Sequence, residues 1–179
     1  MSGSLRLGLI SDTHIPEAGN ELPSQVYEAL QGVDLILHAG DMHIIDVLDW
    51  LESIAPVIGA RGNGDGDGVR PFFPDNDPRV KASHVVKVDD LKIGLVHGFP
   101  LAEEVPWTSW ENLMDRHFGG DVDIIVCGDT HVTLVHEHNG VLMVNPGSAT
   151  MPNNLMSQLG NLAILTIENG IPNVEMIQL

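Results

Sequence analysis

The stretch "LRLGLISDTH" (residues 5–14) is an apolar segment that ends abruptly in two residues with metal-binding side chains, Asp12 and His14. Its first six residues are mostly Leu and Ile, which predicts a buried β-strand over 5–10. The strand therefore carries two candidate ligands directly after its carboxyl end.

Further apolar strands follow, with helical patterns between them. Residues 33–40 and 56–62 have the pattern of strands, and 22–32 and 44–54 that of helices. Alternating strands and helices predict βαβ units and therefore a parallel sheet.

The change from apolar to polar residues recurs at the ends of five further predicted strands, usually beside a glycine. The side chains found there are Asp41, Asn63, His97, Asp129, His131, Asn145 and Ser148. Because ligands of sheets with parallel strands bind outside the carboxyl ends of those strands, we expect one shared site. A mixed shell of Asp, His and Asn suits divalent metals such as Mn, Fe, Ni or Zn.

The second half of the sequence is rich in hairpin signals. Asn-Gly pairs, which favour tight hairpin turns, predict hairpins over 132–147 and 161–179. The remaining predictions are a strand–turn–strand over 83–98, a helix over 104–118 and a strand over 122–128. Two packed sheets flanked by helices accommodate both halves, which predicts an α/β fold.

Length and composition narrow the function. The 179 residues predict one domain over 1–179, with 1–4 as a tail. A net charge of −17 argues against duplex nucleic acid and anionic membranes as partners.

The single cysteine, Cys127, allows no disulfide within the chain and fits the cytoplasm. The sequence shows no signal-peptide pattern and no run long enough to span a membrane.

The ordered set D-x-H, GD, GN, HG and G-x-T-H resembles the calcineurin-like metallophosphoesterases, and is most similar to their small single-domain prokaryotic phosphodiesterases. The resemblance spans Asp12 to Ser148. It implies a four-layer α/β/β/α sandwich of two mixed sheets. It also implies hydrolysis of a phosphodiester or phosphomonoester, in which a hydroxide bridging two metal ions attacks phosphorus.

The same resemblance implies which residues hold the ions. The first ion would be bound by Asp12, His14, Asp41 and His131. The second would be bound by Asp41, Asn63, His97 and Asp129. Asp41, Asn63 and His97 would also take part in catalysis.

One departure from the family concerns a ligand. The family usually has Gly-His-x-His where this chain has Gly128-Asp129-Thr130-His131. Oxygen ligands suit harder ions, so the second site would favour Mn²⁺ or Mg²⁺ over Zn²⁺. We expect two divalent ions, foremost Mn, with Fe, Ni, Zn and Mg as alternatives. Alternatively, Asp129 turns away and the second ion binds weakly.

A second departure is Gly64, where larger phosphatases of the superfamily have a histidine that acts on the leaving group. Its absence favours good leaving groups, or protonation by water or a nearby side chain. Arg61 and His43 are candidate contacts of a small phosphoester substrate, each with a structural role as the alternative. A homo-oligomer is compatible with the sequence.

The glycine-rich run "ARGNGDGDGVR" (60–70) also matches the start of a calcium loop. Counted from Asn63, position twelve is Pro74, where an EF-hand needs a glutamate, so this hypothesis is rejected. Asp65 is expected to shape the loop, and Asp67 has no assigned role. Residues 66–82 are expected to form a surface loop, with a lid over the site as one interpretation.

Several residues have simpler interpretations. His38 is expected to be structural, Cys127 a buried apolar residue, and Trp107 and Trp110 to pack a helix or meet a partner. Asn145 either bonds a histidine ligand or stabilises its turn. No function is assigned to His84, His117, His136 and His138.

One alternative function lies in another class. A non-catalytic protein-binding scaffold on the same fold, such as the retromer complex contains, would keep a degraded metal site. Asp129 is the residue that keeps this alternative open.

Overall fold

The computed structural model describes residues 4–66 and 76–179. Residues 1–3, most of the predicted tail, lie outside the described residues. So do 67–75, which include Asp67 and much of the predicted surface loop.

The first sheet has six strands in the order β11-β10-β1-β2-β3-β4. Strands β1 to β4 are mutually parallel, whereas β10 pairs antiparallel with both β1 and β11. The strands are β1 (Leu5–Ile10), β2 (Leu35–His38), β3 (Val57–Ala60), β4 (Val80–Lys81), β10 (Asn161–Glu168) and β11 (Ile171–Gln178).

The second sheet has five strands in the order β5-β6-β7-β9-β8. Its three central strands are parallel, and antiparallel hairpins form both edges. The strands are β5 (Ser83–Val88), β6 (Leu91–Val96), β7 (Ile124–Val126), β8 (Thr133–His138) and β9 (Val141–Pro146). Both sheets are therefore mixed.

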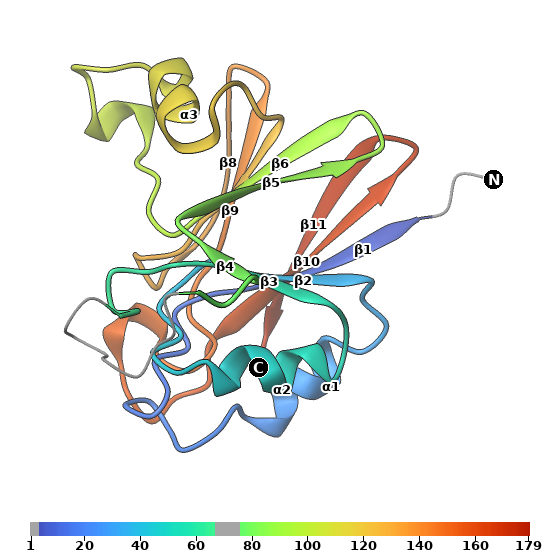
Figure 1. Ribbon diagram of the computed structural model, residues 1–179, viewed down its shortest axis with the longest axis vertical. Coiled ribbons are helices and arrows are strands. Elements are labelled where there is room, and N and C mark those ends of the chain that lie inside the picture. Colours follow the sequence, from blue (N-terminus) through green and yellow to red (C-terminus); the bar gives the residue numbers. More distant parts are fainter. Residues whose placement is uncertain (1–3, 67–75) are drawn as a thin grey trace.

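Helices cover the outer face of each sheet. Helices α1 (Ser24–Ala29) and α2 (Asp46–Glu52) lie against the first sheet, and α3 (Trp110–Phe118) lies at the far end of the molecule against the second (Figure 1). Two short 3₁₀ turns, η1 (Ala102–Glu104) and η2 (Pro152–Asn154), complete the described elements. None of the described helices is long and apolar enough to cross a membrane.

The apolar core follows the alternation of side chains along each strand. In β2, Leu37 packs between the two sheets, and its neighbour Ile36 packs under α1 and α2. In β7, Ile124 and Val126 face the other sheet, and Ile125 faces α3. Burial on both faces explains the nearly continuous apolar runs in these strands. The predicted α/β/β/α sandwich is confirmed.

Three local predictions were wrong in part. Residues 80–81 of the predicted surface loop form β4, which pairs with β3. The predicted helix over 104–118 begins only at Trp110, because Pro106 lacks an N–H and Ser109 caps the helix through the N–H of Asn112. Trp107 lies before this start and is 79% exposed, so only Trp110 packs the helix.

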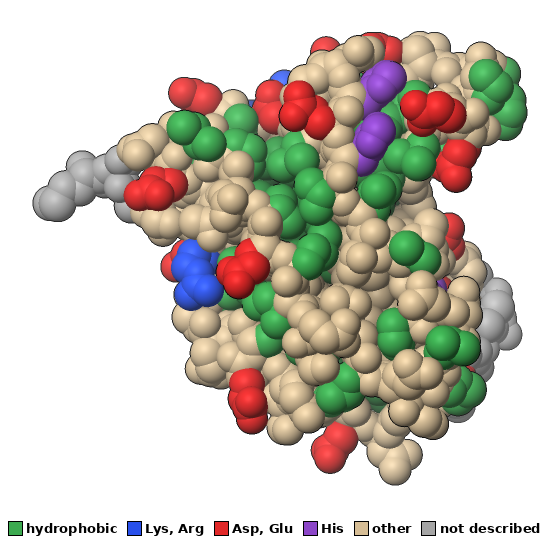
Figure 2. Space-filling view, turned by 180° about the vertical axis from the view of Figure 1, so that it is seen from behind, with side chains coloured by type: hydrophobic (Ala, Val, Ile, Leu, Met, Phe, Trp, Pro, Cys, Tyr) green, Lys and Arg blue, Asp and Glu red, His purple; other side chains and the backbone are tan. Residues whose placement is uncertain are grey.

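The surface agrees with the strongly negative charge. On the face in Figure 2, acidic side chains are spread widely and few Lys or Arg are visible. The sequence contains 8 basic against 25 acidic residues. Such a surface repels the phosphate backbone of nucleic acids.

Candidate metal centre

The candidate ligands converge where the parallel strands of both sheets end. Asp12 and His14 follow β1, Asp41 follows β2, and Asn63 follows β3. From the second sheet, His97 follows β6, and Asp129 and His131 follow β7. Because the sheets stack with these ends together, residues far apart in the sequence meet at one place. All seven predicted ligands lie in this cluster.

The backbone at the cluster is held in an unusual conformation. Six residues there have positive φ angles although none is glycine: Asp12, His14, Asp41, His43, Asp129 and His131. Such a conformation costs on the order of 1 kcal/mol or more for each residue. Asp, Asn and His adopt it most readily among non-glycine residues. Strain of this kind concentrates at functional sites, where it aims side chains inward.

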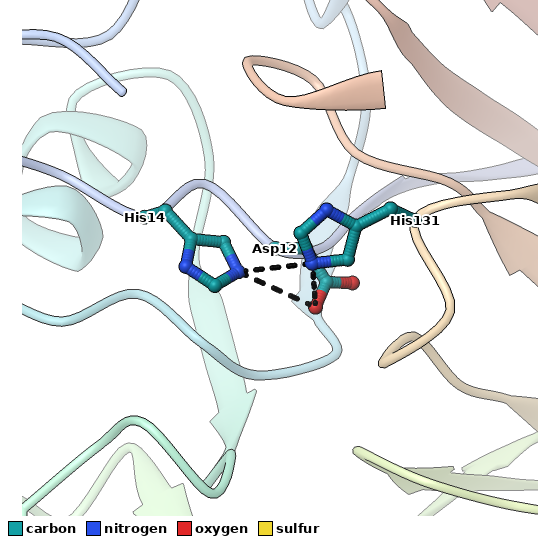
Figure 3. Close-up of side chains that lie close together, drawn as sticks. All are labelled: Asp12, His14 and His131. Carbon is teal, nitrogen blue, oxygen red and sulfur yellow. Dashed lines mark hydrogen bonds and ion pairs between the residues drawn. The ribbon is translucent and has the colours of Figure 1, made fainter. Parts of the chain in front are cut away.

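Three side chains form one half of the cluster. His14 and His131 approach from opposite sides with Asp12 between them (Figure 3). The two histidine Nε2 atoms are 3.1 Å apart. Oδ1 of Asp12 lies 3.9 Å from Nε2 of His14 and 3.5 Å from Nε2 of His131. Donor atoms that each lie about 2.1 Å from a shared ion are separated by roughly 3 to 4 Å. These three atoms therefore have the spacing of metal ligands.

The other half of the cluster surrounds His97. Its Nε2 lies 3.1 Å from Oδ1 of Asn63 and 3.5 Å from Oδ1 of Asp129. The side chain of Asp129 is 54% exposed, but it points toward His97 rather than away from the cluster. The alternative in which Asp129 turns away does not describe this structure.

Asp41 lies between the two halves. Its Oδ2 is 3.6 Å from Nε2 of His14, and its Oδ1 is 3.6 Å from Nε2 of His97. One carboxylate thus offers an oxygen to each half, which is the arrangement of a ligand that bridges two ions.

Backbone carbonyls orient two of the histidines. Nδ1 of His97 donates to the carbonyl of Ala39, and Nδ1 of His131 donates to that of Met151, each at 2.8 Å. A carbonyl can only accept, so the proton sits on Nδ1 and Nε2 faces the cluster. Such bonds to the far nitrogen are typical of histidines that bind metals.

The charges at the cluster favour a cation. Burial acts to lower the pKa of His97, but the Asp41 and Asp12 carboxylates raise it to about 9. Burial acts to raise the pKa of Asp41, but His97 holds it well below its usual range. Without an ion, a proton on His97 compensates the carboxylates, and a metal ion would have to displace that proton.

Asp12 provides a direct test of whether a cation fits. Its Oδ2 accepts hydrogen bonds from Oγ of Ser11 at 2.6 Å and from the N–H of Asp129 at 3.1 Å. Its Oδ1 is buried, faces His14 and His131, and has no hydrogen-bond partner within the described residues. A buried carboxylate oxygen without a donor is costly. A cation would satisfy it, so the residues present fit a divalent ion.

The glycine-rich loop after β3 is shaped by Asp65. Its carboxylate accepts the N–H groups of Asp41 and Gly62 at 2.9 Å and that of His43 at 2.7 Å. Burial raises the pKa of Asp65. At Gly62, a Cβ would overlap Asp41, so only glycine fits there. Asp65 thus shapes the loop, as predicted, and is not turned toward an ion.

The sixth strand end does not supply a ligand. Asn145 donates to the carbonyl of Gly128 at 2.7 Å and accepts the N–H of Gly147 at 2.9 Å, so it stabilises its turn. Ser148 donates to the backbone carbonyl of Asp12 at 2.6 Å. Both residues support the loop that carries the ligands, and of the two roles expected for Asn145 the structure shows the stabilisation of its turn.

The structural interpretations of His38 and Cys127 are confirmed. His38 is buried and accepts the N–H of Gly40, and Cys127 is buried.

Arg61 donates to the carbonyl of Asp65 at 3.2 Å, which places it beside the cluster. His43 is also buried beside the cluster, with its ring centroid 4.3 Å from that of His14. Sequence reasoning gave His43 no part in metal binding, although it lies only two positions after Asp41.

Comparisons with known proteins agree with this geometry. Residues 5–170 match the calcineurin-like phosphoesterase superfamily domain, and the chain belongs to that family. Membership implies divalent metal ions and supports phosphoester hydrolysis in general terms.

Two curated relatives are archaeal. The chain is 36% identical to a probable metallophosphoesterase of Methanothermobacter thermautotrophicus over 82% of this chain and 78% of the relative. It is 31% identical to a probable metallophosphoesterase of Methanocaldococcus jannaschii over 92% of this chain and 78% of the relative.

Among solved structures, vacuolar protein sorting 29 from Cryptosporidium parvum aligns with a TM-score of 0.67 and 27% identity over 98% of both chains.

Proposed function

We propose that this protein hydrolyses small phosphoesters at a centre of two divalent metal ions. The observation that carries the proposal is Asp41, which presents one oxygen to His14 and the other to His97, each at 3.6 Å. A carboxylate shared between two sets of ligands is what a two-metal site requires.

Each proposed ion has four protein ligands. Asp12, His14, Asp41 and His131 would hold the first, and Asp41, Asn63, His97 and Asp129 would hold the second. Three aspartates supply a charge of −3 against +4 from two ions, and the remaining +1 favours an anionic substrate. We propose Mn²⁺ foremost for the second ion, because three of its four ligands offer oxygen.

The residues of this chain position the ions and the substrate. When bound, two divalent ions activate water at neutral pH and neutralise the charge that develops on the phosphoryl oxygens. Asp41 would help to hold both ions. Asn63 is exposed, so its side chain can also meet the substrate. Arg61, the nearby cation that donates to Asp65, is the candidate partner of a phosphoryl oxygen.

The substrate class follows from what the site offers. Gly64 has no side chain to protonate a leaving group, so esters with good leaving groups should react fastest. The acidic surface favours small substrates over polyanions such as duplex nucleic acid. A diester and a monoester of p-nitrophenol together test which class is preferred.

The experiment compares metal-reloaded variants. The purified chain is stripped with a chelator and reloaded with Mn²⁺, and hydrolysis of bis-p-nitrophenyl phosphate and p-nitrophenyl phosphate is followed. Asp41→Ala should lower the rate to that of Mn²⁺ in buffer. Asp90→Ala, in the exposed turn between β5 and β6, is the matched control and should keep the rate of the unmodified protein. Equal rates for both variants would contradict a catalytic role.

The scaffold alternative has one specific observation in its favour. The chain aligns over 98% of its length with vacuolar protein sorting 29 from Cryptosporidium parvum, at 27% identity. On this alternative, the reloaded protein would hydrolyse neither ester although it folds. Asp41→Ala would then change metal content and nothing else.

A further inference from the structure

His43, which is buried, pairs with the exposed Glu17 at the edge of the metal centre. Nδ1 of His43 lies 2.7 Å from Oε2 of Glu17, and the His43 side chain is 6% exposed. The N–H of His43 donates to Oδ1 of Asp65 at 2.7 Å, and its φ angle is 71°. The ring is therefore held at its backbone by Asp65 and at Nδ1 by Glu17.

The other edge of the ring faces the cluster. The ring stands edge-on to that of His14, and ligating atoms of His14, Asp41 and His43 all lie within 4.8 Å of one another. A Cβ at position 64 would overlap Nε2 of His43. Gly64 therefore makes the room in which Nε2 of His43 sits.

We propose that His43 is a further ligand of the ion assigned to Asp12, His14, Asp41 and His131, and that Glu17 positions its ring. This inference rests on the metal centre of the proposed function. Ligands on opposite sides of one ion are about 4.2 Å apart, so a small shift on binding brings all these atoms into reach. A carboxylate on the far nitrogen, like a backbone carbonyl, is a usual partner of a histidine that binds metal.

The additional imidazole makes the two sites chemically unequal. The first site would have three imidazoles and two carboxylates, and the second one imidazole and three oxygen ligands. Nitrogen-rich sites favour Zn²⁺, Fe²⁺ or Ni²⁺, whereas oxygen-rich sites favour Mn²⁺ and Mg²⁺. The protein should therefore bind two different metals when both kinds are offered.

The test measures metal binding without substrate. Protein stripped of metal is titrated with Mn²⁺ by calorimetry, and its Co²⁺ form is examined by visible absorption, which reports the ligands. His43→Asn is the main variant, because asparagine tolerates the positive φ angle. Affinity at one site should fall about tenfold or more, and the Co²⁺ spectrum should change. Glu17→Gln should weaken the same site by a smaller factor.

Two controls and one independent variant sharpen the test. His138→Asn on β8 and Glu21→Gln on the surface should leave metal binding unchanged. Gly64→Ala keeps both His43 and Glu17, but its methyl group displaces the His43 ring, so it should weaken the same site. Circular dichroism shows whether each variant is folded.

The outcomes separate this inference from the proposed function. Unchanged affinity and an unchanged Co²⁺ spectrum in folded His43→Asn and Gly64→Ala would overturn the inference, even if hydrolysis fell, because His43 would then be a substrate contact. Weakened binding in both variants would support it, even if the unmodified protein hydrolysed no ester.

Discussion

Oδ1 of Asp129 lies 3.5 Å from Nε2 of His97, so a carboxylate from the loop after β7 reaches the second half of the cluster. The backbone N–H of Asp129 donates to Asp12, which fixes the residue while its side chain reaches the second half of the cluster. The family resemblance led us to expect a histidine at this position, and the aspartate found there also has a side chain that can bind a metal ion.

Replacing Asp129 should change the second ion alone. Asp129→Ala removes one oxygen ligand. The metal content measured after dialysis should therefore fall from two ions per chain toward one. Asp129→His should keep two ions and hydrolysis, but shift the metal preference from Mn²⁺ toward softer ions. Asp90→Ala is the control. If neither substitution changes the metal content or the metal preference, Asp129 is not a ligand of the second ion.

Asp65 should matter for both stability and metal affinity, although it is not a proposed ligand. Asp65→Ala leaves three buried N–H groups without their acceptor, which costs about 1 to 3 kcal/mol for each group left unpaired. Urea unfolding should show a clear loss of stability, and Mn²⁺ should bind more weakly. Asp46→Ala, at the exposed start of α2, is the control. Full metal affinity in a destabilised Asp65→Ala would contradict its role in placing Asp41.

His38 should make the fold sensitive to acid. The N–H of Gly40 donates to Nδ1 of His38, which holds the ring neutral, and burial lowers its pKa from 6.5 to about 3. The unfolded chain therefore takes up this proton first as the pH falls. The stabilisation is complete above about pH 6.5 and is lost progressively toward pH 3, by an amount on the order of a few kcal/mol.

The measurement is urea unfolding at a series of pH values between 3 and 7. His38→Gln should be less stable at pH 7, because it loses the hydrogen bonds of the ring, but its stability should fall less steeply with acid. His138→Gln serves as the control. If the free energy of unfolding falls equally steeply with pH in the unmodified protein and in His38→Gln, His38 is not a source of acid sensitivity.

The layer between the two sheets should dominate stability. Leu37 is fully buried there, and Leu37→Ala should lower the free energy of unfolding by about 2 to 5 kcal/mol, through lost burial and the remaining cavity. Leu155 is 51% exposed, and Leu155→Ala should change stability by less than about 1 kcal/mol. Thermal unfolding of both variants tests this prediction. Comparable losses of stability in Leu37→Ala and Leu155→Ala would argue against a core between the sheets.

Sequence patterns predicted most of the strands and the cluster because both depend on local signals. An apolar run followed by Gly-Asp or Gly-Asn marks a strand end, and parallel strands bring such ends together. Asp41 and His97 could therefore be placed in one site before any contact was known. Asn-Gly likewise predicted both hairpin turns, because the pair favours the backbone of a tight turn.

The parts that sequence reasoning missed depend on contacts between distant segments. Val80 and Lys81 form a strand only because β3 offers an edge, and two residues carry no periodic signal of their own. The place of His43 depends on Glu17 from the loop after β1, and on Asp65 and the missing side chain at Gly64 from the loop after β3. No spacing along the chain reveals that combination.

The central claim is that Asp41 bridges two ions, and anomalous X-ray scattering from crystals loaded with Mn²⁺ tests it most directly. The account predicts two anomalous peaks about 3.5 to 4 Å apart, one on each side of the Asp41 carboxylate. The first should lie among Asp12, His14 and His131, and the second among Asn63, His97 and Asp129. A single peak, or a second peak away from His97 and Asp129, would contradict the account.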